Sequence, residues 1–316
     1  MKQYFGIDIG GTAVKLGIVD ETGKVLCKGE QSVNFDGYQT PVLDTVRKAA
    51  KEFLTAQAIP VESLSGIGVS ATGQIDSRKG IVAGTCGNFP NYIGSPIKAA
   101  LEQDFGLPVT VANDANCMTL GEVWVGGAQG YTDVIGVTLG TGVGGGIIAN
   151  GQLVRGVHFT AGEYSFVNTN AEAWDAPDQN MACQCSTSNL LKWYRARKAL
   201  PEDAPLDGRS FFAAANAGEP EALEVLRRFC HAVAVQIYNL TVLLDVEKVA
   251  IGGGISKQPL LLESLRSAYD GLYASRAGQA YMEGLPRCQI VPCAFSSEAN
   301  QVGVAAAYFE AMQKKC

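Results

Sequence analysis

The sequence predicts an α/β protein of two related lobes, and a repeated strand pattern carries this prediction. Residues 4–9, 14–19 and 24–29 form an antiparallel meander of three expected strands, with a glycine turn at the first bend. The same order of buried strand, glycine turn and strand returns at 134–139 and 147–149, followed by an Asn-Gly hairpin turn. With 316 residues, the chain is long enough for two such lobes, each with its own core.

The remaining elements alternate between buried strands and helices whose apolar residues recur at helical spacing. The helices are expected at 42–54, 96–105, 222–244 and 298–313, and the strands at 66–70, 108–112 and 248–251. The alanine-rich last helix is expected to pack back on the first lobe. The N-terminal lobe would then comprise residues 1–115 together with about 298–316, and the C-terminal lobe residues 116–297.

Composition and charge argue against several function classes. The formal net charge is −6 and no basic block occurs, which disfavours nucleic-acid and membrane-surface partners. No apolar run approaches the length of a membrane span, and no secretory leader is expected ahead of Asp8. We therefore expect a cytoplasmic protein whose 9 scattered cysteines remain reduced. Two histidines are too few for a multi-histidine metal centre.

Many of the glycines lie in three short loops, at 8–12, 139–146 and 251–256. Each loop follows an expected buried strand. Glycines at a strand end let backbone N–H groups converge on anionic oxygens without a Cβ in the way. Two such loops facing each other would hold the β- and γ-phosphates of ATP. The candidate nucleotide-binding residues are Asp8, Gly10, Gly11, Thr12, Lys15, Gly140, Thr141, Gly142, Gly252, Gly253 and Gly254.

Other interpretations of these loops are weaker. A single glycine turn is more often structural, and Lys15 is equally well explained as a surface lysine. The second loop satisfies GxGxxG, but a dinucleotide-binding loop opens a helix, whereas a strand is expected after Gly146. A nicotinamide-dependent oxidoreductase is thus disfavoured. No GxxxxGK[ST] stretch occurs, which excludes a P-loop.

Two aspartates are candidates for the chemistry. Asp8 lies near the end of the first expected strand, where its carboxylate could hold the Mg²⁺ of MgATP directly or through water. Asp114 follows the strand at 108–112, begins a helix, and could accept a proton late in phosphoryl transfer to an alcohol. From this stretch alone, an ordinary N-cap explains Asp114 equally well.

Taken together, these stretches resemble the ROK family of repressors, open reading frames and kinases. The resemblance spans nearly the whole chain and rests on Asp8-Ile-Gly-Gly-Thr12, Asn113-Asp114-Ala-Asn116 and the two later glycine loops. It implies the two-lobed actin-like ATPase (ribonuclease H-like) fold with an interlobe cleft, and a homodimer. It also implies ATP-dependent phosphorylation of a hexose or hexose derivative at the 6-hydroxyl, with Asp114 as the base. The implied sugar contacts are Gly73, Asn88, Asn113 and Glu163.

Two departures from the family pattern bear on the substrate. The Glu-x-Gly-His stretch of the family's glucokinases stands here as Glu163-Tyr164-Ser165-Phe166, without the histidine. The zinc motif is reduced to Cys183 and Cys185, too few thiolates for a closed structural site, and no zinc is expected. Tyr164 and Phe166 could instead stack on a sugar. We therefore expect a β-glucoside, an amino sugar such as N-acetylmannosamine, or another modified hexose rather than plain glucose.

Two other functions occur within the resemblance to this family: a repressor and a sugar sensor. A repressor of this family carries a DNA-binding segment before the first phosphate loop, and this loop begins at Asp8. The acidic balance agrees with the expectation of no nucleic-acid partner. A catalytically weak or inactive sugar sensor is the alternative that stays open, although Asp8, Asp114 and all three glycine loops are present.

Overall fold

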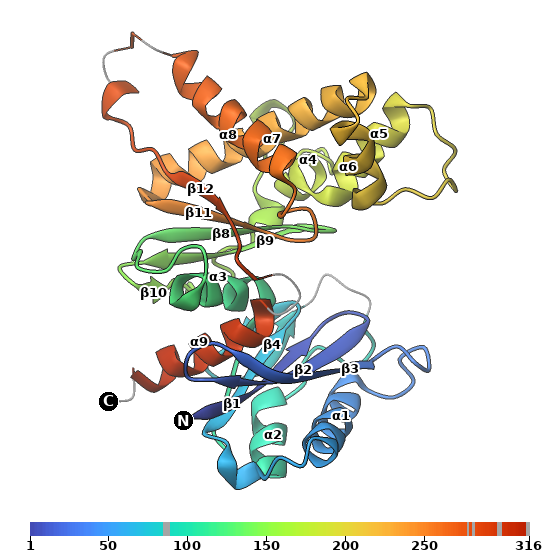
Figure 1. The fold of residues 1–316 in the computed structure, drawn as a ribbon, viewed down its shortest axis with the longest axis vertical. Helices are drawn as coiled ribbons and strands as arrows, with labels where there is room; N and C mark the ends of the chain where they lie inside the picture. Colours follow the sequence, from blue (N-terminus) through green and yellow to red (C-terminus); the bar gives the residue numbers. More distant parts are fainter. Residues whose placement is uncertain (85–88, 277, 280–281, 296–298, 314–316) are drawn as a thin grey trace. The chain divides into compact units, whose positions relative to one another are not determined.

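The structure is a computed structural model that describes residues 1–84, 89–276, 278–279, 282–295 and 299–313. The chain divides into two compact units (Figure 1). Unit 1 comprises Met1–Gly130, Gln152–Ala161 and Ser297–Cys316, and unit 2 comprises Tyr131–Gly151 and Gly162–Ser296.

A five-stranded mixed sheet forms the centre of unit 1, in the order β3-β2-β1-β4-β7. Its strands are β1 (Gln3–Ile9), β2 (Ala13–Asp20), β3 (Val25–Ser32), β4 (Gly66–Ala71) and β7 (Val109–Asn113). The first three form the expected antiparallel meander, whereas β1, β4 and β7 run parallel. Because the carboxyl ends of parallel strands meet at one edge, the residues that follow β1, β4 and β7 are brought together there.

Four helices pack around this sheet: α1 (Val42–Ala56), α2 (Ile97–Phe105), α3 (Asp114–Val125) and α9 (Ala299–Gln313). The apolar face of α1 fits the expected helical pattern, with buried residues from Val42 to Leu54 packed into the core of the unit. A small hairpin, β5 (Gln74–Asp76) and β6 (Ile81–Gly84), and the 3₁₀ turn η1 (Val61–Ser63) complete the unit.

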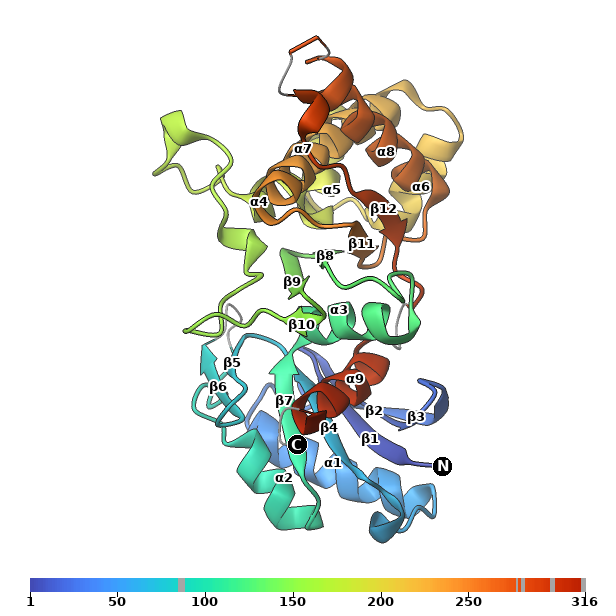
Figure 2. The ribbon, with the colours of Figure 1, turned by 90° about the vertical axis from the view of Figure 1, so that its left-hand side faces the viewer.

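The last helix, α9, lies across the sheet beside α3 (Figures 1 and 2), as expected for the alanine-rich C-terminal segment. Gly17, Gly6 and Gly68 stand side by side on β2, β1 and β4. A Cβ at any of them would come within 3.1 Å of atoms of α9, from Gln301 or Val304. These glycines inside strands let α9 approach the sheet closely. The sequence had indicated a role for glycines in loops only.

Unit 2 repeats the sheet order of unit 1, and it opens with the second meander that the repeated strand pattern predicted. Its sheet has the order β10-β9-β8-β11-β12, with an antiparallel meander and two parallel strands. The strands are β8 (Val134–Leu139), β9 (Val143–Ala149), β11 (Lys248–Gly252) and β12 (Gln289–Pro292), together with the short edge strand β10 (Gln152–Leu153), which the division by contacts assigns to unit 1. Asn150 and Gly151 both have positive φ, which fits the expected type I′ hairpin turn.

Helices α4 to α8 surround one large apolar core in unit 2. They are α4 (Met181–Cys185), α5 (Thr187–Arg197), α6 (Gly208–Asn216), α7 (Pro220–Leu244) and α8 (Pro259–Ala274). Short 3₁₀ turns η2 (Tyr164–Phe166), η3 (Ala171–Ala173) and η4 (Met282–Gly284) occur in the connecting segments. The stripe of apolar residues along 222–244 is core packing, as its spacing indicates.

Two boundaries differ from the expected ones. The expected lobe boundary lies after residue 115, but the division by contacts falls after Gly130, because α3 packs on α9 and stays with unit 1.

The second glycine run was expected to be a turn throughout 140–146. Instead β9 already begins at Val143, which pairs with Leu139 of β8, so the turn comprises only Gly140–Gly142.

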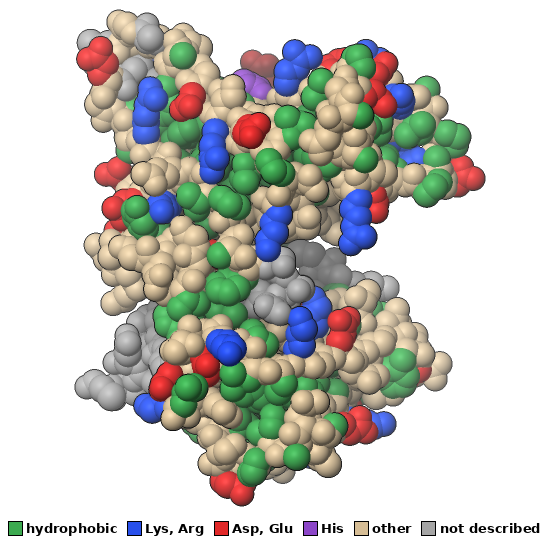
Figure 3. Space-filling view, viewed as in Figure 1, with side chains coloured by type: hydrophobic (Ala, Val, Ile, Leu, Met, Phe, Trp, Pro, Cys, Tyr) green, Lys and Arg blue, Asp and Glu red, His purple; other side chains and the backbone are tan. Residues whose placement is uncertain are grey.

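Charged side chains of both signs are interspersed on the face shown in Figure 3. None of the described helices is long and apolar enough to cross a membrane.

Candidate active site

Asp8 is a buried carboxylate held on one of its two oxygens. It lies between Lys15 of β2 and Ser70 of β4 in the sheet register. The Ser70 hydroxyl donates to Oδ1 at 2.8 Å, and the Asn300 side-chain amide of α9 donates to the same oxygen at 2.9 Å. Burial raises the pKa of Asp8, while these two hydrogen bonds and the Lys15 charge act against that rise.

The second oxygen of Asp8, Oδ2, receives no hydrogen bond from the described residues. A carboxylate oxygen is a ligand that hard cations such as Mg²⁺ prefer. The donor set therefore fits the magnesium role expected for Asp8: the protein holds Oδ1 and leaves Oδ2 for a cation or its water.

The first glycine loop is fixed by its backbone and by an aromatic group. The Gly10 N–H donates to the Ala13 carbonyl at 2.9 Å, closing the turn between β1 and β2. The Tyr38 hydroxyl donates to the Gly11 carbonyl at 2.6 Å, and a Cβ on Gly11 would lie 3.1 Å from the Phe89 ring. Thr12, at the end of the loop, is exposed. The loop is thus a hydrogen-bonded turn with its threonine accessible.

Asn113 links the expected sugar-contact segment to the helix that begins with Asp114. Its Oδ1 accepts hydrogen bonds from the backbone of Ala115 at 2.9 Å and of Asn116 at 3.2 Å, which makes Asn113 the N-cap of α3. Its Nδ2 donates to the Gly73 carbonyl at 2.9 Å. The capping role proposed as the alternative for Asp114 therefore belongs to Asn113, and Asp114 is the first residue of the helix.

Asp114 and Asp8 act on the same buried neighbours. Burial raises the pKa of Tyr92, and the charges of Asp114 and then Asp8 raise it further. Burial likewise raises the pKa of Cys117 well above its ordinary value, again with contributions from both carboxylates. The sheet register agrees with this, because Asp8 pairs with Ser70 and Ser70 with Ala112, so Asp8 near the end of β1 and Asp114 just after β7 both belong to the carboxyl edge of the unit 1 sheet.

The second glycine loop, in unit 2, is a tight turn held by α5 and by Ser165. The Gly140 N–H donates to the Gly142 carbonyl at 3.0 Å, and Thr187 at the start of α5 donates its N–H to the Gly140 carbonyl at 2.9 Å. Ser165 Oγ lies 3.0 Å from both the N–H and the carbonyl of Val143. Thr141, at the tip, is exposed.

The third glycine loop adjoins the second because β11 runs parallel to β8. Gly253 has a φ of +96°, and a Cβ there would lie 2.3 Å from the Leu139 carbonyl, so only glycine fits. Gly254 has open space around its Cβ position. Gly252, the last residue of β11, is buried. Of the three glycines, Gly253 is thus explained by packing within unit 2, whereas Gly254 has no such structural requirement.

Glu163 lies half-buried just before η2, and burial raises the pKa of its carboxyl. Its two aromatic neighbours differ in exposure. Phe166 is 69% exposed and accessible for stacking. Tyr164 is 3% exposed and packs under β9, where its ring takes the space that a Cβ on Gly145 would need. The expectation that Tyr164 could stack on a sugar is therefore wrong, because the ring belongs to the core of unit 2.

The two cysteines of the reduced zinc motif share the short helix α4, with Cys183 half-buried and Cys185 buried. Burial raises the pKa of Cys185 to about 12, which disfavours a thiolate. Within the described part of the chain, no three His, Cys, Asp or Glu side chains are grouped so that they could hold a metal ion.

Several residues at the site were not anticipated from the sequence. Ser70, Asn300, Tyr38 and Ser165 hold Asp8 or the glycine loops. The one available signal was Ser70, a polar residue at the end of an otherwise apolar buried strand. Asn88, an expected sugar contact, lies outside the described residues.

Comparisons with known proteins agree with the resemblance found in the sequence. A family model described as "ROK family" matches residues 4–313. A β-glucoside kinase of Klebsiella pneumoniae is 35% identical over 265 residues, which cover 82% of this chain and 84% of that protein.

Two solved structures are similar over nearly the whole chain. A ROK family protein from Streptococcus pneumoniae TIGR4, in complex with sucrose, has a TM-score of 0.84 at 27% identity and covers 99% of each chain. A ROK family glucokinase from Streptomyces griseus, in complex with glucose and AMPPNP, has a TM-score of 0.76 at 28% identity and covers 96% of this chain and 98% of that one. The prediction of an actin-like ATPase fold is confirmed by this similarity.

Proposed function

This chain belongs to the ROK family, and we propose that it is an ATP-dependent carbohydrate kinase that phosphorylates the 6-hydroxyl of a β-glucoside. The observation that carries the proposal is that Asp8 and Asp114 both lie at the carboxyl edge of the unit 1 sheet, where Asn113 holds the Gly73 carbonyl. The β-glucoside kinase that is 35% identical to the chain supports both the reaction and the substrate class.

Asp114 is the proposed general base. A sugar hydroxyl is too weak an acid to lose its proton to a carboxylate beforehand, so the proton moves late, as the phosphoryl group arrives. Asp114 Oδ1 accepts the N–H of Ala115 at 2.8 Å, at the amino end of α3. This hydrogen bond orients the Asp114 carboxylate at the start of the helix.

Asp8 is the proposed magnesium carboxylate, through its Oδ2. When bound, Mg²⁺ neutralises the charge that develops on the phosphates of ATP. The protein's own contribution is positional. The turns around Gly11 and Gly140 are closed by hydrogen bonds, and Thr12 and Thr141 are exposed beside backbone N–H groups. Little covalent chemistry is left to the protein in such a transfer, so positioning and charge supply most of the rate.

The proposed substrate class rests on Phe166, three residues after Glu163. The histidine of the family's glucokinases is replaced by Phe166, whose ring is exposed. An exposed aromatic face suits stacking against the apolar face of a second ring, which a glucoside carries and free glucose lacks. The half-buried Glu163 remains as a hydrogen-bonding partner for a sugar hydroxyl.

A coupled ADP-release screen tests the proposal. ATP, Mg²⁺ and a panel of β-glucosides, glucose, N-acetylglucosamine and N-acetylmannosamine are supplied to the wild type and to Asp114→Asn. We expect kcat/KM to be highest for a β-glucoside, and we expect kcat to fall by roughly 10²–10⁴-fold in Asp114→Asn, as for the loss of a general base.

A matched control keeps the test specific. Asp20→Asn changes another carboxylate of unit 1, at the end of β2, which accepts hydrogen bonds from the Thr22 hydroxyl and the Lys24 N–H. This variant should leave kcat unchanged. Full activity of Asp114→Asn would remove the assigned base. Sugar binding without ADP release across the panel would favour the sugar-sensor alternative, and a wide preference for glucose would refute the substrate class.

A further inference from the structure

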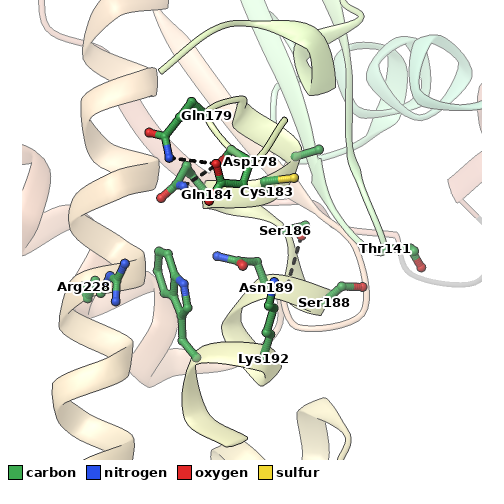
Figure 4. A pocket seen from close by; sticks show the side chains of 12 residues that line it. Thr141, Asp178, Gln179, Cys183, Gln184, Ser186, Ser188, Asn189, Lys192 and Arg228 are labelled. Atoms are coloured by element: carbon green, nitrogen blue, oxygen red, sulfur yellow. Dashed lines mark hydrogen bonds between the residues drawn. The ribbon is translucent and has the colours of Figure 1, made fainter. Parts of the chain in front are cut away.

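A cavity of about 370 Å³ lies in unit 2, away from the residues assigned above except for Thr141. Figure 4 shows it between α5, α7 and the segment that carries Asp178 and Cys183. Its volume is within the range of small-molecule sites and exceeds what a single inorganic anion fills. Most of its lining side chains are polar: Thr141, Asp178, Gln179, Cys183, Gln184, Ser186, Ser188, Asn189, Lys192 and Arg228, together with Ala182 and Trp193.

Positive charge predominates in this cavity. Lys192 projects from α5 and Arg228 from α7, and neither forms an ion pair with the described residues. The guanidinium of Arg228 lies over the Trp193 ring, 3.8 Å from its centroid. This stacking orders Arg228 and leaves its N–H groups available at the edge. Asp178 is the carboxylate on the opposite side, and its Oδ1 already accepts a hydrogen bond from Gln179 at 3.1 Å.

Asn189 gives an independent sign of a ligand. It is 91% buried, and its Nδ2 has no hydrogen-bond partner in the described part of the chain. Its side chain extends from α5 toward the side on which Arg228 lies (Figure 4). A buried donor without a partner is unfavourable, and an acceptor supplied by a ligand would satisfy it after a small rearrangement of the wall.

The start of α5 adds to the attraction for anions. Ser186 caps the helix through the N–H of Asn189, and Ser188 lines the cavity in the first turn. The amino end of an 11-residue helix carries partial positive charge. Two cations, one donor amide, hydroxyl groups and a helix terminus surround the same space, with an aromatic ring for an organic group.

We propose that this cavity binds a phosphate ester, with Lys192 and Arg228 holding the phosphate and Asn189 donating to one of its oxygens. Two esters have this chemistry. One is the adenine nucleotide of the proposed function, and the other is a hexose 6-phosphate, its product. The choice of these two esters rests on the proposed function. The binding of a phosphate ester in the cavity does not, since it is measured without turnover.

Isothermal titration of the whole protein with ADP, with glucose 6-phosphate and with inorganic phosphate tests this. We expect Arg228→Gln and Lys192→Gln each to weaken one of the two esters by about tenfold, the loss typical of a charge-assisted hydrogen bond. Arg227→Gln, the matched control on the neighbouring exposed cation outside the cavity, should leave binding unchanged. An effect on ADP alone identifies the nucleotide, and an effect on glucose 6-phosphate alone identifies a product site.

Asn189→Leu separates ligand binding from folding. Because Nδ2 has no partner to lose, we expect this variant to keep or raise the thermal midpoint while it weakens the same ester. The proposal is overturned if Arg228→Gln and Arg227→Gln bind both esters equally well, or if only inorganic phosphate binds. A protein that binds the ester through Arg228 but phosphorylates no sugar would contradict the proposed function and leave this cavity assignment standing.

Discussion

At the scale of single residues, the arrangement around Asp8 assigns a different task to each carboxylate oxygen. Ser70 and Asn300 both donate to Oδ1, and they come from a strand and from the last helix. Two donors on one oxygen fix the rotation of the carboxylate, so the direction of Oδ2 is fixed as well. The residues behind Asp8 should therefore affect cation binding without touching the cation.

Ser70→Ala tests this positioning role. Removing one hydrogen bond to a charged group, at about 1.5–3 kcal/mol, should raise the Mg²⁺ concentration needed for half-maximal activity about tenfold. Direct titration with Mn²⁺, followed by paramagnetic resonance in the presence of ADP, should show the same weakening. Ser63→Ala, which removes an exposed hydroxyl bonded to the Pro60 carbonyl, serves as the control. An unchanged cation requirement in Ser70→Ala would contradict the positioning role.

The sequence could identify Asp8 and Asp114 but not the residues that hold them. Each aspartate lies at the end of an apolar strand with a recognisable motif, which is local information. Asn300 stands 292 residues after Asp8, and only the closure of α9 over the glycines of the sheet brings it there. For Tyr164 the local motif was misleading. Its position suggested a sugar contact, but its ring is buried in the core of unit 2.

At the scale of elements, the junction of β7 and α3 depends on a single side chain. Asn113 caps α3 with Oδ1 and holds the Gly73 carbonyl with Nδ2. Gly73 has a φ of +95°, a conformation that glycine adopts without strain. One amide thus fixes the start of the helix that carries Asp114 and the turn that follows β4.

Two substitutions at Asn113 separate these contributions. Asn113→Ala should lower the free energy of unfolding by about 2 kcal/mol, since it loses both a helix cap and a hydrogen bond of about 1 kcal/mol each. Asn113→Asp keeps a capping oxygen and loses only the donor to Gly73, so about half that cost is expected. Urea unfolding gives both values, with Asn180→Ala at the cap of α4 in unit 2 for comparison. Equal losses in the two Asn113 variants would show that the cap contributes nothing.

The glycine run at 139–146 shows what an element pattern can and cannot reveal. The turn was expected from glycine alone, but only Gly140–Gly142 form it, and the rest are strand residues of β9. Gly145 is required because Tyr164 packs where its side chain would be. A run of glycines has the same appearance in sequence whether it bends the backbone or admits a neighbouring ring, so the tertiary contact decides.

At the scale of the whole molecule, unit 1 is assembled from both ends of the chain. Its sheet begins with β1, and its last helix, α9, arrives only after all of unit 2. The repeated opening meander of the two sheets could be predicted, because its strand pattern repeats in sequence. The lobe boundary could not, since α3 is assigned by its packing on α9 rather than by its position in the chain.

The contact between α9 and α3 is the point where this assembly is most sensitive. A Cβ on Gly303 of α9 would lie 1.9 Å from the backbone carbonyl oxygen of Cys117 in α3, so Gly303→Ala must push the two helices apart. We expect it to lower the free energy of unfolding by about 1–3 kcal/mol, as overpacking does. Gly271→Ala is the matched control, because Gly271 lies in α8 with open space around its Cβ position and should gain about 0.5–1 kcal/mol from helix propensity. Urea unfolding of both variants, followed by Asp8-dependent Mn²⁺ binding, tests the sign of each change. If Gly303→Ala were as stable as Gly271→Ala, the close approach of α9 to α3 would contribute nothing to the stability of unit 1.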